Sequence, residues 1–184
     1  LTVTGTSGAL SRGGSAGLTV TSPSSGGTRT ISIDFVGTGT AMGASETAGV
    51  VAVANWNNAT GASRSTPLAL VDRTGAATGA TVTWSSNSTS TLPITDSAGN
   101  RRMMRGFLNT SSSSVTTLTV AGLPTGAYDV YVYADGDNGS NARTGAYAIS
   151  GPGITTTTTN LTDAANTNFN GTFVRAQNST GNYV

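Results

Sequence analysis

Short runs of strand-forming residues recur along the whole chain, roughly every 10 to 20 residues, and each run is bounded by Gly, Pro, Asn or Ser. The segment 30–36 shows the pattern most clearly, because apolar Ile31 and Ile33 alternate with polar residues. Alternation with a period of two residues is typical of a strand that turns one face toward a core. Ser32 and Asp34 are therefore expected on the opposite face of this strand. The pattern predicts about a dozen short, mostly antiparallel strands.

The composition also favours strands over helices. The chain has 184 residues, with no Lys, a single Glu and only 9% charged residues, so the usual helix formers are scarce. We therefore expect an all-β protein that folds as a single β-sandwich or jelly roll. Segment 41–53 is the one candidate helix, and the turn 122–126 predicts a hairpin between its two flanking strands. The expected strands are 1–4, 18–21, 30–36, 50–56, 67–72, 80–84, 103–108, 115–120, 128–134, 146–150, 154–159, 172–175 and 183–184.

Several residue types on which catalysis depends are missing from the chain. His, Cys and Lys do not occur, which excludes Ser-His-Asp triads, Cys-His pairs, histidine metal sites and Schiff-base chemistry. A carboxylate pair of the glycosidase kind would still be possible. Only Asp135 and Asp137 are close together in the sequence, however, and they occupy an expected turn. We predict that the protein is not an enzyme.

Charge and hydropathy indicate which partners to expect. The net charge is +1, which is too small for a nucleic-acid-binding surface. No segment approaches the roughly 18 consecutive apolar residues that a membrane span requires. The chain begins at Leu1 without an initiator Met, and it is rich in Thr, Ser, Asn and Gly. We therefore expect an exported protein, extracellular or on the cell surface, whose signal peptide has been removed.

From Ile31 to the end, the chain carries several motifs in a distinctive order and spacing. They are ISIDFVG (31–37), VANWNN (53–58), TVTW (81–84), RRMMRGFLN (101–109), VAGLPTGAYDVYVYADGDNG (120–139), TGAYAIS (144–150), NFNGTFVRA (168–176) and GNYV (181–184). With these motifs the chain resembles secreted β-sandwich modules of the galactose-binding-like jelly-roll type, found in surface and exported proteins of environmental bacteria. The resemblance implies the fold more than the function, because such modules generally have no assigned activity.

The resemblance also implies that the last strands of the module are displaced. In the family, further strands follow the Asn-Tyr-Val stretch, whereas this chain ends there at Val184. Residues 1–22 look like that missing end, with two Leu-Thr-Val-Thr strands around a Gly/Ser/Arg loop. Either the module is circularly permuted, or residues 1–22 complete the sandwich of a neighbouring subunit. We therefore divide the chain into an N-terminal arm, residues 1–22, and a β-sandwich domain, residues 23–184.

Donation of the arm predicts a structural protein whose partners are copies of itself. Each subunit would give an arm and receive one, so an extracellular filament or surface assembly would grow head to tail. The expected assembly residues are Leu1, Val3, Leu18 and Val20 in the arm, with Tyr183 and Val184 at the receiving sheet edge. The alternative is a non-catalytic carbohydrate-binding module, in which Tyr131, Tyr133 and Trp56 are exposed platforms for sugar rings.

Two further kinds of site are suggested by short motifs. Asp135, Asp137 and Asn138 lie in a loop rich in Asp, Asn and Gly, which suits a calcium ion, although a tight turn requires the same residues. Asn-x-Ser/Thr sequons predict glycosylation, and composition alone would generate several of them in a chain so rich in Asn and Thr. The sequons begin at Asn58, Asn87, Asn109, Asn138, Asn160, Asn170 and Asn178.

Overall fold

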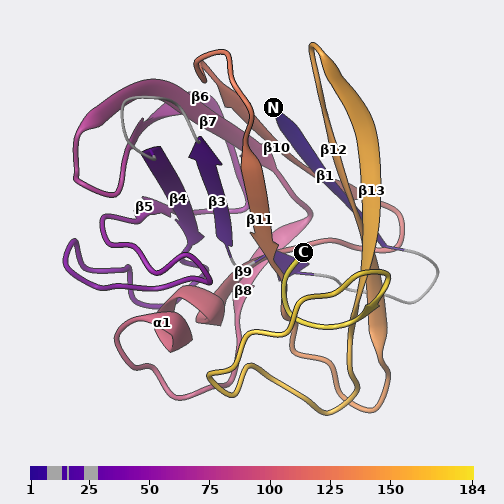
Figure 1. The fold of residues 1–184 in the computed structure, drawn as a ribbon. Coiled ribbons are helices and arrows are strands. Elements are labelled where there is room, and N and C mark those ends of the chain that lie inside the picture. The colour runs from indigo at the N-terminus through magenta and orange to yellow at the C-terminus, as the bar shows by residue number, and fades with distance from the viewer. Residues whose placement is uncertain (8–13, 16, 23–28) are drawn as a thin grey trace.

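The structure, a computed structural model, describes residues 1–7, 14–15, 17–22 and 29–184. In this part of the chain the fold is all-β, with three sheets and one short helix, α1 (Asn100–Arg105), as Figure 1 shows. The seven-stranded sheet has the order β14 (Ser179–Thr180), β13 (Ile154–Asp163), β12 (Arg143–Gly151), β1 (Thr2–Ser7), β10 (Val115–Ala121), β7 (Ala77–Ser85) and β6 (Ser63–Val71). The four-stranded sheet has the order β11 (Asp129–Tyr133), β3 (Gly17–Ser22), β4 (Arg29–Phe35) and β5 (Asn57–Ala59). The small third sheet contains β2 (Gly14–Ser15), β9 (Gly106–Asn109) and β8 (Ser88–Thr91).

The main core lies between the seven-stranded and the four-stranded sheets. Ile31, Ile33 and Phe35 of β4 are each at most 4% exposed and belong to this core. Phe35 meets Trp84 of β7 edge to face, with ring centroids 5.7 Å apart, so side chains of the two sheets interdigitate. Paired strands are antiparallel except for β4 with β5 and β13 with β14. The expected all-β class with mostly antiparallel strands is confirmed, and the arrangement is consistent with a β-sandwich.

The four-stranded sheet buries its other face as well. A second core, which comprises Met42, Ala48, Val53, Trp56, Met103, Met104, Tyr133 and Phe169, covers that face. The alternation of β3 and β4 turns Thr19, Ser32 and Asp34 toward it, and all three are buried. The hydroxyls of Thr19 and Ser32 hydrogen-bond to each other at 3.1 Å. Polar groups that would face water on a half-buried sheet are therefore enclosed here.

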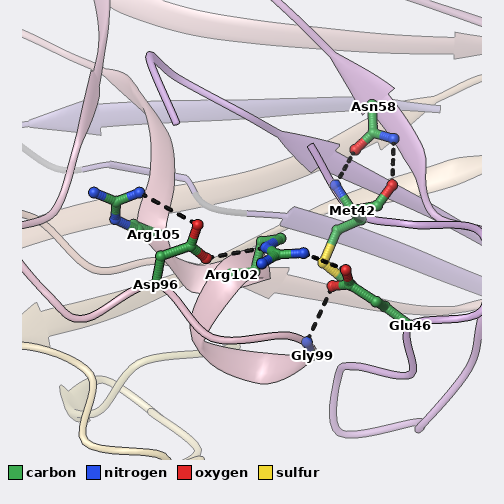
Figure 2. Close-up of polar contacts among 7 residues, drawn as sticks. All are labelled: Met42, Glu46, Asn58, Asp96, Gly99, Arg102 and Arg105. Atoms are coloured by element: carbon green, nitrogen blue, oxygen red, sulfur yellow. Dashed lines mark hydrogen bonds and ion pairs between the residues drawn. The ribbon is translucent and has the colours of Figure 1, made fainter. Parts of the chain in front are cut away.

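A polar network ties the loop after β4 to α1 (Figure 2). Asn58 holds the loop through both ends of its amide, because Oδ1 accepts from the Met42 amide at 2.8 Å and Nδ2 donates to the Met42 carbonyl at 2.9 Å. Arg102 of α1 donates to Asp96 at 3.0 Å and forms an ion pair with Glu46. The charged residues around α1 therefore pair with one another and hold the loop over the second core.

Some of the expected elements do not form. Segment 41–53 was expected to be a helix, and this prediction is wrong: the segment consists of turns with an isolated bridge between Ala48 and Val53. Gly49 has a φ of 92°, which a right-handed helix excludes. Segments 50–56 and 172–175 are not strands, and the expected strand at 103–108 begins inside α1.

The predicted hairpin between β10 and β11 is also wrong. The two strands belong to different sheets, since β10 pairs with β1 and β7, whereas β11 pairs with β3. The Pro- and Gly-containing turn reverses the chain as expected, but turn chemistry does not decide which sheet receives the next strand. Each strand buries an apolar face against the main core from its own side, and this tertiary burial determines the pairing.

Asp34 is a buried acid without hydrogen bonds. Its side chain is 0% exposed, and neither carboxyl oxygen has a partner among the described residues. Burial raises the pKa of Asp34 well above its usual range; the nearby Met42 amide lowers it, Glu46 raises it and Arg102 lowers it. That amide donates to Asn58 instead. Because the native state holds a proton that the unfolded chain releases, Asp34 costs stability as the pH rises.

We predict that Asp34→Asn raises the melting temperature near neutral pH, because an amide of the same shape cannot ionise. Relief of about 1–2 kcal/mol would raise the melting temperature by roughly 2–8 °C in a domain of this size. The gain should shrink near pH 4, where the native carboxyl is already protonated. Thermal melts followed by circular dichroism measure it, with exposed Asp129→Asn as the control. A lower melting temperature for Asp34→Asn near neutral pH would contradict the prediction.

Candidate functional site

The arm supplies an interior strand of both large sheets, β1 in the seven-stranded sheet and β3 in the four-stranded sheet. β1 pairs with β10 on one side and with β12 on the other, over almost its whole length. β3 pairs with β11 on one side and with β4 on the other. Figure 1 shows the two indigo strands between these neighbours. Removal of the arm would therefore leave β10 and β12, and also β11 and β4, without a shared partner.

The apolar residues of the arm belong to the main core. Val3, Leu18 and Val20 are 6%, 1% and 2% exposed, and Leu1 packs against the same core. The ammonium group of Leu1 donates to the Val120 carbonyl at 3.0 Å, and the Val120 amide donates back to the Leu1 carbonyl at 2.8 Å. These four residues, predicted for assembly, are thus brought together between the sheets.

The structure does not bring Tyr183 and Val184 next to the arm. Val184 exchanges two backbone hydrogen bonds with Val132 of β11, at 2.9 and 3.0 Å, and Tyr183 forms an isolated bridge to Tyr133. β11 lies between these residues and β3, so the C-terminal residues occupy the outer edge of the four-stranded sheet. The strands that pair with the arm are β10 and β12 for β1, β11 and β4 for β3, and β9 for the short strand β2.

The aromatic residues predicted to bind sugar do not form an exposed strip. Tyr133 is 0% exposed and Trp56 is 4% exposed, while Tyr131 is half-buried. Trp56 and Tyr133 lie against each other with ring centroids 6.1 Å apart, and the Tyr133 hydroxyl accepts from the Val50 amide at 2.9 Å. The expectation of sugar-stacking platforms is therefore wrong for Tyr133 and Trp56. The second core covers the face on which they lie.

The acidic loop after β11 brings two of its three predicted calcium ligands together with an acid that sequence reasoning missed. Asp135 and Asn138 are buried, whereas Asp137 is exposed. Asp163, at the end of β13, accepts from the Gly136 amide at 3.0 Å through Oδ2. Asn138 donates through Nδ2 to the backbone carbonyl of Asp163 at 3.2 Å. The cluster is therefore buried Asp135 and Asn138 with half-buried Asp163.

The two acids of this cluster have raised pKa values. Burial raises the pKa of Asp135 to about 7, and the neighbouring Asp163 carboxyl adds to the rise. Burial also raises the pKa of Asp163 to about 6, although the Gly136 amide and Arg143 act in the opposite direction. Among the described residues, no group of three or more Asp, Glu, His or Cys side chains is gathered in one place. The pair is thus a local carboxyl pair and not part of a larger acidic cluster.

The sequons divide by accessibility. Asn87, Asn160, Asn170 and Asn178 are exposed, and Asn109 is half-buried. Asn138 is 4% exposed and uses Nδ2, the atom to which a glycan is attached, to donate to two carbonyls. Nδ2 of Asn58 is likewise bound to Met42. Asn58 and Asn138 are therefore unsuitable for glycans in the folded protein, in contrast to the expectation from the sequence motif alone.

No family model, curated protein or solved structure matches this chain. The resemblance to galactose-binding-like modules therefore stays an expectation, and the function must be argued from geometry. No helix in the described ranges is long and apolar enough to cross a bilayer.

We predict that the carboxyl pair makes the protein less stable at about pH 8 than at about pH 5 in metal-free buffer. The native state retains protons up to pKa values of about 6 and 7, whereas an unfolded Asp loses its proton near 3.8, so stability falls as the pH rises through this window. Asp72 and Asp96 have lowered pKa values, and their contribution is lost only at lower pH.

Melting temperatures measured across this range test the prediction. Asp163→Asn should flatten the dependence, because the amide can still accept from Gly136 but carries no charge. Asp137→Asn, in the same loop but exposed, should leave the dependence unchanged. Equal slopes for the wild type and Asp163→Asn would show that the pair does not cause it.

Proposed function

We propose that this protein is a non-catalytic structural subunit of an extracellular filament or surface assembly, joined by donation of the arm from one copy to the next. The observation that carries the proposal is that β1 and β3 of the arm are interior strands of the two large sheets. A segment whose strands pair with neighbours on both sides in two sheets has the position that a donated segment requires.

The rest of the sandwich depends strongly on an arm in this position. Without the arm, the strands that flank β1 and β3 would expose unpaired backbone N–H and C=O groups. Such exposure is unfavourable, and it favours pairing with another chain. Burial of Leu1, Val3, Leu18 and Val20 contributes on the order of 1.5–3 kcal/mol for each fully buried side chain. Inserted arms are therefore expected to leave slowly.

The contacts of the arm are the same whether it comes from its own chain or from a neighbour. When each subunit gives its arm to the next, the giving and receiving surfaces differ. Contacts of this kind build an open polymer unless the rotation between neighbouring subunits closes a ring. The abundance of Thr, Ser, Asn and Gly, with 9% charged residues, favours an exported surface protein over an intracellular one.

The backbone pairing identifies a crosslink that distinguishes the two sources of the arm. Leu1 and Val120 exchange two backbone hydrogen bonds. Hydrogen-bonded and non-hydrogen-bonded pairs alternate along an antiparallel ladder, so the partners Thr4 and Thr117 form a non-hydrogen-bonded pair with closely spaced side chains. The chain contains no cysteine, so a disulfide introduced at this pair has no competitor.

We predict that purified protein forms fibres in negative-stain electron microscopy, and that Thr4→Cys/Thr117→Cys fibres give a covalent ladder on non-reducing gels. The ladder should collapse to monomer after reduction. The control is Thr144→Cys/Thr162→Cys, whose native hydroxyls lie 2.8 Å apart on β12 and β13 of one sandwich, and it should remain monomeric. Crosslinked monomers alone in the Thr4/Thr117 variant, or single particles without fibres, would mean that each arm stays in its own chain.

A further inference from the structure

A buried and a half-buried carboxyl group converge at one end of the sandwich from separate parts of the fold. Asp135 follows β11, and Asp163 ends β13. Each is oriented by a backbone amide, since Oδ2 of Asp135 accepts from Phe169 at 2.6 Å and Oδ2 of Asp163 accepts from Gly136 at 3.0 Å. Both residues line the same pocket and the same small cavity. This geometry is held by the backbone and does not depend on flexible side chains.

The pair has no ion-pair partner in the described part of the chain. The ion pairs there involve Asp72, Asp96 and Glu46, but neither Asp135 nor Asp163. Arg143 lies close enough to lower the pKa of Asp163, but its Nη1 atom donates to the Asp137 carbonyl at 3.0 Å. Acids that are buried or half-buried without a bound counter-charge are costly in an ionised state. A cation at this position would remove that cost.

The Asn138 amide provides a second and independent indication of a missing ligand. Asn138 is 4% exposed, and its Nδ2 atom donates to the carbonyls of Asp163 and Ala164 at 3.2 and 2.8 Å, which fixes the orientation of the amide. Its Oδ1 atom is buried and has no hydrogen-bond partner. An unsatisfied buried acceptor costs about 1–3 kcal/mol, and a cation would satisfy it.

A pocket gives solvent access to the pair. Its volume is about 190 Å³, and its lining includes both carboxyls together with Thr167, Asn168 and Asn182. Room beside the acids allows bound waters to complete a coordination shell. Calcium takes six to eight oxygen ligands in a flexible geometry, whereas magnesium demands a nearly ideal octahedron. Two carboxylates and one amide oxygen on converging loops therefore suit calcium better than magnesium.

We propose that Asp135, Asp163 and Asn138 form a calcium site that joins the end of β11 to the end of β13. The site replaces the exposed Asp137 of the sequence motif with Asp163. None of the three residues belongs to the arm, so the proposal does not depend on the proposed function.

Isothermal titration calorimetry of the 184-residue chain with CaCl₂, after treatment with a chelator, tests the proposal. We expect saturable binding of one Ca²⁺ per chain, with weaker binding of Mg²⁺. Asp163→Asn and Asp135→Asn should each weaken Ca²⁺ binding at least about tenfold, as expected for loss of a charged ligand. The exposed neighbour Asp137→Asn is the matched control and should bind as the wild type does. Absence of saturable binding in the wild type, or equal losses in all three variants, would overturn the proposal.

Terbium luminescence locates the site without changing a ligand. Tyr147 lines a small cavity together with Asp135 and Asp163, so its ring is placed to sensitise Tb³⁺ bound there. Tyr147→Phe should lose most of the sensitised emission and keep Ca²⁺ binding in calorimetry. Emission that Ca²⁺ does not displace, or that persists in Tyr147→Phe, would place the ion elsewhere and refute the site. The terbium measurement remains decisive even where Asp135→Asn or Asp163→Asn fails to fold.

Discussion

Backbone hydrogen bonding of β1 and β3 is the interaction on which the rest of this fold depends. Each strand has neighbours on both sides, and the two belong to opposite sheets. The main core is closed only when Val3, Leu18 and Val20 fill the space between those sheets. One segment at the start of the chain therefore determines the integrity of both sheets and of the core between them. This is also why the source of the arm, own chain or neighbour, is the central question about function.

Burial of both faces of the four-stranded sheet explains the unusual chemistry elsewhere in the molecule. When one face of a sheet is exposed to solvent, the polar residues on that face are hydrated. Here the second core buries Asp34, which has no hydrogen-bond partner among the described residues. At one end of the sandwich, buried Asp135 and half-buried Asp163 also have raised pKa values. The chain has only eight acidic residues, and three of them occupy environments that disfavour their charge.

The local pattern of the sequence predicted which residues alternate, but not what covers them. The pattern of Ile31 and Ile33 correctly indicated the core face of β4, and the all-β class follows from many such runs. The same periodicity placed Tyr133 and Val132 on opposite faces of β11. It could not reveal that residues distant in sequence bury the face on which Tyr133 lies. Asp163 was missed for the same reason, because pairing of β12 with β13 brings it to Asp135 across a long stretch of chain. Where an arm inserts, and in which molecule, is likewise a tertiary property.

The place of the arm also has a mechanical consequence. Hydrogen bonds of an antiparallel pair run perpendicular to the strands, so tension along β1 would load its bonds to β10 and β12 together and not one after another. The same segment continues into β3, which is held in the same manner by β11 and β4. A pull along these strands would have to shear many bonds at once in each sheet. Joints of this kind would resist extension far better than contacts that can be peeled apart.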